Sequence, residues 1–281
     1  MMSRSSKARS FVAAEGRVSG CRIAPRCAGA HSARMLDHPG IIAGMTLVFV
    51  LAGFIKGVIG LGLPTVAMAF LTLMMPPAEA AAVLILPSFV TNVWQLAGPQ
   101  LGALIRRLWA MQLAGALATV ATARWLGAVS SGGTVAALGA ALVLYAASGL
   151  MPLRLDVPAR HETWLGPLIG GATGAVTATT GVFVIPAVPY LQALRLAPDA
   201  LVQALGLSFT VSTVALAAAL AGDGSFRWPS AGAALIALAA AFGGMQLGAA
   251  VRARMRPATF RRWLFVGLGA LGVHLMLRAL L

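Results

Sequence analysis

Apolar residues dominate the chain from about residue 41 to its C-terminus, and short polar stretches divide this region into long segments. A helix that crosses a bilayer needs roughly 20 consecutive, mostly apolar residues, and most of the segments reach that length. The pattern therefore predicts an all-α fold, a polytopic integral membrane helix bundle. The segments run over about residues 41–75, 78–97, 108–128, 133–151, 164–194, 199–221, 231–250 and 262–281.

The first and fifth segments are too long for one straight crossing, and each contains residues that interrupt a helix. The sequence "GLGLP" occupies 60–64, and "TATTGVFVIPAVP" occupies 177–189. Glycine tolerates non-helical backbone angles, and proline lacks the N–H group that a helix interior needs. We therefore expect a broken helix at both places. The bundle then has 8–10 transmembrane elements, depending on whether each broken segment crosses the bilayer once or twice.

The two halves of the chain show weak internal similarity. Each half has a GxxxG pair, a break rich in Gly or Thr, and a proline-begun helix with a Ser-Phe pair about three turns on. Duplicated halves with interrupted helices at matching positions are typical of secondary transporters. We therefore predict two homologous halves. They are a first membrane repeat over 41–151, a connecting loop over 152–163 and a second membrane repeat over 164–281.

Composition agrees with a membrane protein, since 59% of the 281 residues are hydrophobic and 10% are charged. An average soluble domain has about 25% charged residues. The formal net charge of +14 does not indicate nucleic-acid binding, because the basic residues lie in the N-terminal tail and the loops, without interleaved aromatic residues. Basic loops instead mark the cytoplasmic side of a membrane protein.

Two arginine clusters suggest how the chain is oriented. We interpret Arg106 and Arg107 as one cytoplasmic loop, and the arginines between 252 and 262 as another. Six crossings separate these loops if the second broken segment crosses twice. That number agrees with ten crossings in total, five in each half, and with halves of inverted topology. The N-terminus of the membrane region would then lie outside, which the basic N-terminal arm opposes.

Residues 1–40 are basic, rich in small residues and without apolar periodicity, so we predict a disordered arm. Met35 and Met45 are alternative start sites, which leaves open whether residues 1–34 belong to the mature protein. The chain has neither cysteine and histidine motifs with metal-ligand spacing nor a nucleotide-binding P-loop. We see no carboxylate pair placed for acid–base catalysis. The sequence therefore predicts no metal, no cofactor and no enzyme activity.

Lys56 is the charged residue that lies well inside an apolar segment. A buried intramembrane cation is costly and usually marks a functional site, although a lysine near the end of a helix can also snorkel to the membrane interface. No acidic residue lies at a comparable depth to neutralise Lys56, whereas an anionic ligand would. After Gly57, Gly60 and Gly62, Pro64 restarts a helix whose first N–H groups suit an anion. For the GxxxG glycines Gly53 and Gly170 we favour close helix packing, and for Gly60 and Gly62, which bracket the break, we favour the site.

The second break offers hydroxyl groups instead of a cation. The hydroxyls of Thr179 and Thr180, beside Gly181, could donate to an oxyanion, or they could bond back to helix carbonyls. Asn92 and Gln95 lie one turn apart on the segment that follows the first break, and such amides serve either as ligands or as bonds between helices. The predicted substrate-binding residues are Lys56, Gly57, Gly60, Gly62, Asn92, Thr179, Thr180 and Gly181.

Two stretches of the chain carry a resemblance to a known family: "GFIKGVIGLGLPTVAMAFLTLMMPPAEAAAVLILPSFVTNVWQLAGP" in the first half and "GGATGAVTATTGVFVIPAVPYLQALRLAPDALVQALGLSFTVSTVALA" in the second. Through these stretches the chain resembles the TauE/SafE family of sulfite exporter-like permeases. The resemblance covers about residues 41–281. Many members have a triple glycine at the first break, where this chain has "GLGLP" preceded by Lys56. The positions that match the family motifs are Gly57, Gly60, Gly62, Pro64, Gly174, Thr180, Gly181 and Pro186.

The resemblance implies a multi-pass permease of the bacterial inner membrane that moves sulfite, sulfonates, sulfoacetate or related small organic anions. Together with the buried cation, it predicts a secondary transporter of small anions. The expected partners are a small anionic substrate and the lipid bilayer, with no nucleic acid, and a homo-oligomer is left open. The alternative is a membrane subunit or scaffold that transports nothing.

Overall fold

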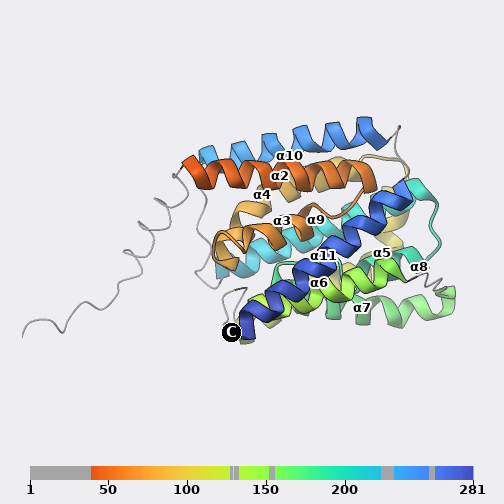
Figure 1. Ribbon diagram of the computed structural model, residues 1–281. Helices are drawn as coiled ribbons and strands as arrows, with labels where there is room; N and C mark the ends of the chain where they lie inside the picture. The colour runs from red at the N-terminus through yellow and green to blue at the C-terminus, as the bar shows by residue number, and fades with distance from the viewer. Residues whose placement is uncertain are drawn as a thin grey trace, which may run out of the picture.

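The computed structural model describes residues 39–126, 129, 133–151, 156–222, 231–252 and 257–280, and the regular structure in these ranges is helical (Figure 1). The arm predicted for 1–40 lies outside the described residues, except for its last two, which begin the first described helix. The first half contains α2 (Pro39–Ile59), α3 (Leu63–Leu71), α4 (Pro77–Leu96), α5 (Leu101–Leu126) and α6 (Thr134–Leu150). The second half contains α7 (Ala159–Thr180), α8 (Ala187–Ala193), α9 (Pro198–Gly222), α10 (Ala231–Arg252) and α11 (Pro257–Leu280).

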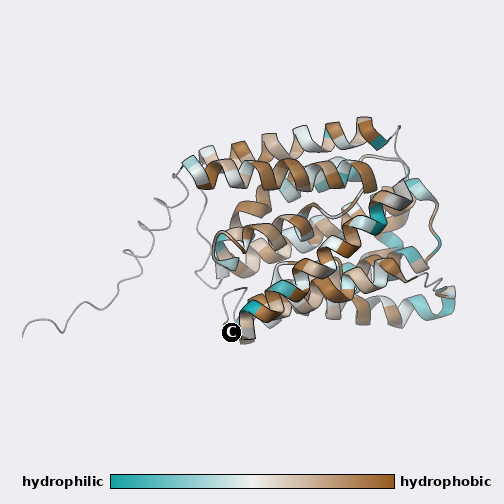
Figure 2. Ribbon diagram, in the orientation of Figure 1, coloured by the Kyte–Doolittle hydropathy of each residue, from teal (hydrophilic) through white to brown (hydrophobic). Residues whose placement is uncertain are grey.

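The helical bundle confirms the predicted fold class. In the described residues, five helices are long and apolar enough to cross a membrane: α2, α4, α9, α10 and α11. Large apolar side chains such as Leu47, Leu117 and Leu247 are exposed on the outside of the bundle, where apolar residues are frequent (Figure 2). Burying such surface in lipid is favourable, whereas exposing it to water is not. The protein is therefore a multi-pass membrane protein.

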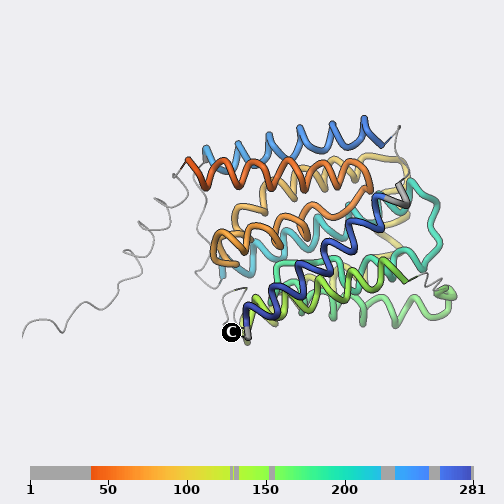
Figure 3. The backbone as a smooth tube through the Cα atoms, viewed as in Figure 1, coloured from red at the N-terminus to blue at the C-terminus, as the bar shows by residue number. Residues whose placement is uncertain are grey.

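Both predicted breaks are present, and each reverses the direction of the chain. α3 returns along α2, so that Met74 lies beside Gly44 near the beginning of α2. α8 returns along α7 in the same way, with Tyr190 close to Gly166 and the carbonyl of Ala193 accepting a hydrogen bond from the N–H of Val157. The described helices thus run alternately in opposite directions (Figure 3). With five helices in each half, corresponding helices of the two halves point in opposite directions.

The two halves also pack on each other reciprocally. α2 lies along α10 and α7 lies along α5, so the first helix of each half contacts the fourth helix of the other. The GxxxG glycines make both contacts close. A Cβ atom at Gly53 would lie 2.1 Å from the carbonyl oxygen of Ala241, and one at Gly170 would lie 2.1 Å from that of Met111. These glycines therefore have the helix-packing role that the sequence favours for them.

Several helices begin earlier than the apolar pattern predicted. α5 begins at Leu101 rather than near 108, and α11 begins at Pro257 rather than near 262. Arg106 and Arg107 therefore belong to α5, and the prediction that they form a loop is wrong. Hydropathy marks only the lipid-facing part of a helix. Leucine, alanine and arginine favour helix, and the backbone hydrogen bonds continue beyond the apolar core.

Arginine residues gather at one end of the bundle, which we call the arginine end. Two ion pairs lie there: Arg107 of α5 pairs with Glu162 of α7 at 2.6 Å, and Arg195, after α8, pairs with Asp156, before α7, at 3.0 Å. The described arginines of this end are Arg106, Arg107, Arg160, Arg195, Arg252, Arg261 and Arg262. The other end has Arg124 and Arg278 among the described residues. The positive-inside rule predicts that the arginine end is cytoplasmic.

Candidate functional site

Lys56 is buried inside the bundle near the end of α2, with 2% of its surface exposed. Its ammonium nitrogen Nζ donates hydrogen bonds to Oγ1 of Thr91, at 3.0 Å, and to Oδ1 of Asn92, both on α4. The side chain therefore does not snorkel to the surface. Within the described part of the chain, no carboxylate lies within ion-pair distance of Lys56. The ammonium group is hydrogen-bonded, but no carboxylate of the described residues neutralises it.

The neighbouring amides complete a polar cluster between α2 and α4. Gln95 lies one turn after Asn92, and its Nε2 donates to the carbonyl oxygen of Gly60 at 2.7 Å, at the C-terminal end of α2. Asn92 and Gln95 therefore form bonds between helices. The second polar atom of each amide, Nδ2 of Asn92 and Oε1 of Gln95, is buried without a hydrogen-bond partner, as are the hydroxyls of Ser88 and Thr65. A buried polar atom left unpaired costs about 1–3 kcal/mol, so such atoms commonly mark a site that pairs with something further.

The backbone of the first break needs its glycines. Gly60 has a φ of +86° and Gly62 a φ of +109°, in the left-handed region that favours glycine. α3 then begins at Leu63 with Pro64 in its first turn, and no side chain caps it. Its first N–H groups consequently have no partner within the helix. A Cβ atom at Gly62 would lie 3.4 Å from Cγ2 of Ile55, so the chain at the beginning of α3 lies beside the residue that precedes Lys56.

Gly57, although next to Lys56, faces a different neighbour. A Cβ atom there would lie 2.2 Å from the carbonyl oxygen of Met245 on α10. The structure therefore places Gly57 in the contact between α2 and α10. Its role there is close packing, and the polar cluster lies toward α4 instead.

The predicted residues of the second break make local bonds. The hydroxyl of Thr179 donates to the carbonyls of Ala175, at 3.1 Å, and Val176, at 3.2 Å. The hydroxyl of Thr180 donates to the carbonyl of Val176 at 2.6 Å and accepts a bond from the N–H of Val182 at 3.1 Å. A threonine in apolar surroundings commonly bonds to the free carbonyl one turn back, which was the alternative left open.

The residues of the two breaks do not together surround one binding site in this structure. Gly181 ends α7 with a φ of +71°, and a Cβ atom there would lie 2.8 Å from Cε of Met68 on α3. Across the ranges that the structure describes, we find no hydrogen bond between Lys56 or Asn92 and the residues 179–181. The polar cluster around Lys56 is built by α2, α3 and α4, with α9 packed alongside α4.

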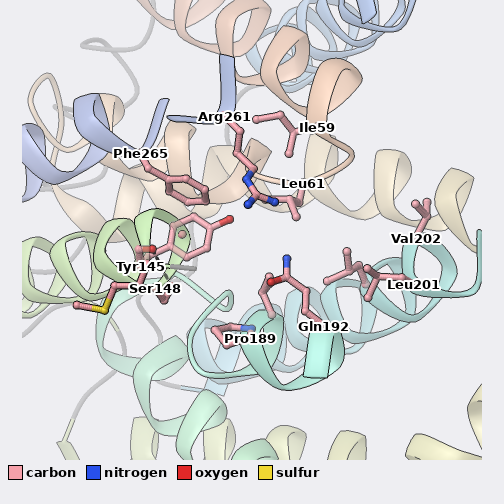
Figure 4. A pocket seen from close by; sticks show the side chains of 14 residues that line it. Ile59, Leu61, Tyr145, Ser148, Pro189, Gln192, Leu201, Val202, Arg261 and Phe265 are labelled. Atoms are coloured by element: carbon pink, nitrogen blue, oxygen red, sulfur yellow. Dashed lines mark hydrogen bonds between the residues drawn. The ribbon is translucent and has the colours of Figure 1, made fainter. Parts of the chain in front are cut away.

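A cavity of about 390 Å³ lies beside the first break, toward the arginine end (Figure 4). Ile59 and Leu61, on either side of Gly60, form part of its wall. Tyr145 of α6, Gln192 of α8 and Arg261 of α11 also line it. The sequence pattern does not indicate these three residues as site residues. It marks Arg261 only as part of a basic cluster, and the one signal it offers is that Tyr145 is one of only two tyrosines in the chain.

The described residues contain no group of three or more His, Cys, Asp or Glu side chains that could hold a metal ion. The groups that surround Lys56 are hydroxyls and amides, and the cavity beside it contains an arginine. A lysine and an arginine attract an anion and repel a metal cation, and the neighbouring amide and hydroxyl groups can donate hydrogen bonds to an anion.

Inverted halves with reversing, broken helices are typical of membrane transporters. The comparison with protein families agrees, since the family described as "Sulfite exporter TauE/SafE" matches residues 45–275. The chain belongs to the TauE/SafE family, as the resemblance predicted, and is a membrane transporter; members of this family are transporters rather than enzymes. No curated protein and no solved structure was found to match it.

Proposed function

We propose that the protein is a secondary transporter of small anions in the bacterial inner membrane, and that its substrates are sulfur-containing or related organic anions. The observation that carries this proposal is the buried, unneutralised Lys56 beside the break between α2 and α3. The family name points to sulfite, and sulfonates and sulfoacetate share its oxyanion chemistry.

Electrostatics favours an anion at this position. An ammonium group has three N–H donors, and the bonds to Thr91 and Asn92 use two of them. These neutral partners satisfy hydrogen bonds but provide no countercharge, and an ammonium group without one is costly inside the bundle. An oxyanion would take the third donor and neutralise the charge. The unpartnered Nδ2 of Asn92 is a further donor for the same anion.

The architecture provides a route for transport. Because corresponding helices of the two halves point in opposite directions, rocking one half against the other would open the site alternately to each side. The site lies next to backbone that is already broken, and irregular backbone within a membrane is tolerated only against protein or a water-filled cavity. The rival function, a scaffold that transports nothing, gives no reason for an unneutralised lysine in the interior.

Flux through proteoliposomes tests this function. We expect labelled sulfite, sulfoacetate or acetate to enter vesicles that contain the wild-type protein, and we expect Lys56→Gln to reduce the rate at least about tenfold. A charge-assisted hydrogen bond contributes about 1.5–3 kcal/mol, which corresponds to roughly 10- to 100-fold in affinity.

The matched control is Arg124→Gln, which removes an exposed cation at the end of α5. It should leave flux unchanged. If neither wild type nor the variants move any of the anions, the transport proposal fails and the scaffold gains support. If Lys56→Gln transports anions as well as wild type, the anion-binding site is not at Lys56.

A further inference from the structure

Among the described residues that line the cavity beside the first break, Arg261 is the charged one. In Figure 4 the guanidinium group of Arg261 points into the cavity, toward the hydroxyl of Tyr145 and the amide of Gln192. No ion pair of Arg261 occurs among the described residues. The cavity therefore presents an arginine without a carboxylate, and its planar fork of donors suits a sulfonate or carboxylate group.

Tyr145 supplies a second, independent sign of a ligand site. Its side chain is 2% exposed, and its hydroxyl is buried without a hydrogen-bond partner although it faces the cavity. The ring is held in place by an edge-to-face contact with Phe265, at 5.1 Å between ring centroids. A buried tyrosine hydroxyl usually has a partner, and leaving it unpaired is costly. An oxyanion held by Arg261 would accept its proton.

The remaining wall of the cavity is largely apolar. Ile59, Leu61 and Leu205 contribute aliphatic surface to it. The hydroxyl of Ser148 is already used, because it donates to the carbonyl of Tyr145 at 2.8 Å. One cation, two neutral polar groups and an aliphatic wall match an anion with one charged head group and a short apolar body.

We propose that this cavity is a second anion-binding station of the transporter, in which Arg261, Tyr145 and Gln192 hold the head group of a small monoanionic sulfonate or carboxylate. The inference rests on the proposed function, since it places a station on the route of the same substrate. Ile59 and Leu61 join the cavity to the break next to Lys56. An anion that moves between Lys56 and the arginine end would pass through it.

Both halves of the protein build the station. Tyr145 comes from α6 of the first half, whereas Gln192 and Arg261 come from α8 and α11 of the second. Relative motion of the halves would therefore change the distance between its polar groups. This is the behaviour expected of a station that binds on one side and releases on the other.

Ethanesulfonate is a suitable probe, because it has one charge and a short aliphatic group. We would measure its concentration dependence in two ways: thermal stabilisation of purified protein in detergent, and uptake into proteoliposomes. We expect Arg261→Gln to raise the half-saturating concentration about tenfold or more, and Tyr145→Phe to raise it severalfold. Arg261→Lys keeps the charge without the planar fork and should give an intermediate value.

Arg262 provides the matched control, because it is the adjacent arginine and is exposed like Arg261, but it does not line the cavity. Arg262→Gln should change the half-saturating concentration less than about twofold, because Arg262 does not line the cavity and an exposed charge away from the ligand contributes little. If Arg261→Gln and Arg262→Gln bind ethanesulfonate equally well, the station is overturned.

A double variant separates this inference from the proposed function. Lys56→Gln alone should retain part of the stabilisation by ethanesulfonate, and adding Arg261→Gln should remove it. If Lys56→Gln alone removes all stabilisation, the cavity does not bind by itself and the inference is overturned. If wild-type vesicles move no anion while stabilisation by ethanesulfonate still depends on Arg261, the proposed transport function is rejected and the proposed anion-binding station is supported.

Discussion

At the scale of single residues, the protein keeps a lysine charge inside the bundle with neutral partners. Thr91 and Asn92 orient the ammonium group of Lys56 through hydrogen bonds but leave its charge available. A carboxylate in place of either partner would form an internal ion pair. That pair would compete with any anionic ligand, so the neutrality of the partners is as important for the proposed site as the lysine itself.

Asn92→Asp tests this argument with little change of shape. The new carboxylate should pair with Lys56, because the amide oxygen of Asn92 already accepts its hydrogen bond. We expect anion flux to fall roughly 10- to 100-fold while the thermal midpoint is unchanged or higher. Wild-type flux in a folded Asn92→Asp protein would contradict an anion site at Lys56.

At the scale of helices, glycines have two different structural roles. Gly60 and Gly62 allow positive φ angles where α2 ends and α3 begins. Gly53 and Gly170 allow two helix backbones to approach closely, with α10 and α5 respectively as partners. The two tasks predict different consequences of substitution, since the first concerns backbone conformation and the second concerns space.

The contact between α7 and α5 offers a matched pair for the packing task. Gly170→Ala would place a Cβ atom 2.1 Å from the carbonyl oxygen of Met111, whereas a Cβ atom at Gly171 has nothing within 4 Å. We expect Gly170→Ala to lower the free energy of unfolding by about 1–3 kcal/mol through overpacking. Gly171→Ala should be neutral or slightly stabilising, because alanine favours helix. Thermal unfolding in detergent compares them, and equal midpoints would contradict the packing role.

At the scale of the whole molecule, the inverted halves produce two cavities at opposite ends of the antiparallel pair α6 and α11. The first contains Arg261 and lies at the arginine end, between α8, α9 and the beginning of α11. The second, of about 420 Å³, lies at the other end, between the connection from α3 to α4, the beginning of α6 and Arg278 of α11. The connection from α3 to α4 corresponds to that from α8 to α9, so the two cavities occupy equivalent places in the two halves.

Cysteine labelling can test whether the two cavities face opposite sides of the membrane. In a protein with Cys21→Ser and Cys27→Ser, we expect an impermeant maleimide to label Ser148→Cys from the cytoplasmic side and Met74→Cys from the other side. Ser148 lines the first cavity and Met74 the second, and the positive-inside rule orients the arginine end. Labelling of both positions from the same side would contradict the inverted arrangement.

The sequence alone determined the bundle, both breaks and the isolated position of Lys56, because apolar length, glycine, proline and a buried charge act locally along the chain. It could not decide between roles that depend on a neighbour from another helix. Only the tertiary structure showed that Lys56 donates a hydrogen bond to Asn92 and that Gly57 contacts α10. It also showed that the hydroxyls of Thr179 and Thr180 donate to carbonyls of their own helix. The cavity was also beyond the sequence, because Tyr145 and Arg261 are far apart along the chain and meet only where α6 packs against α11.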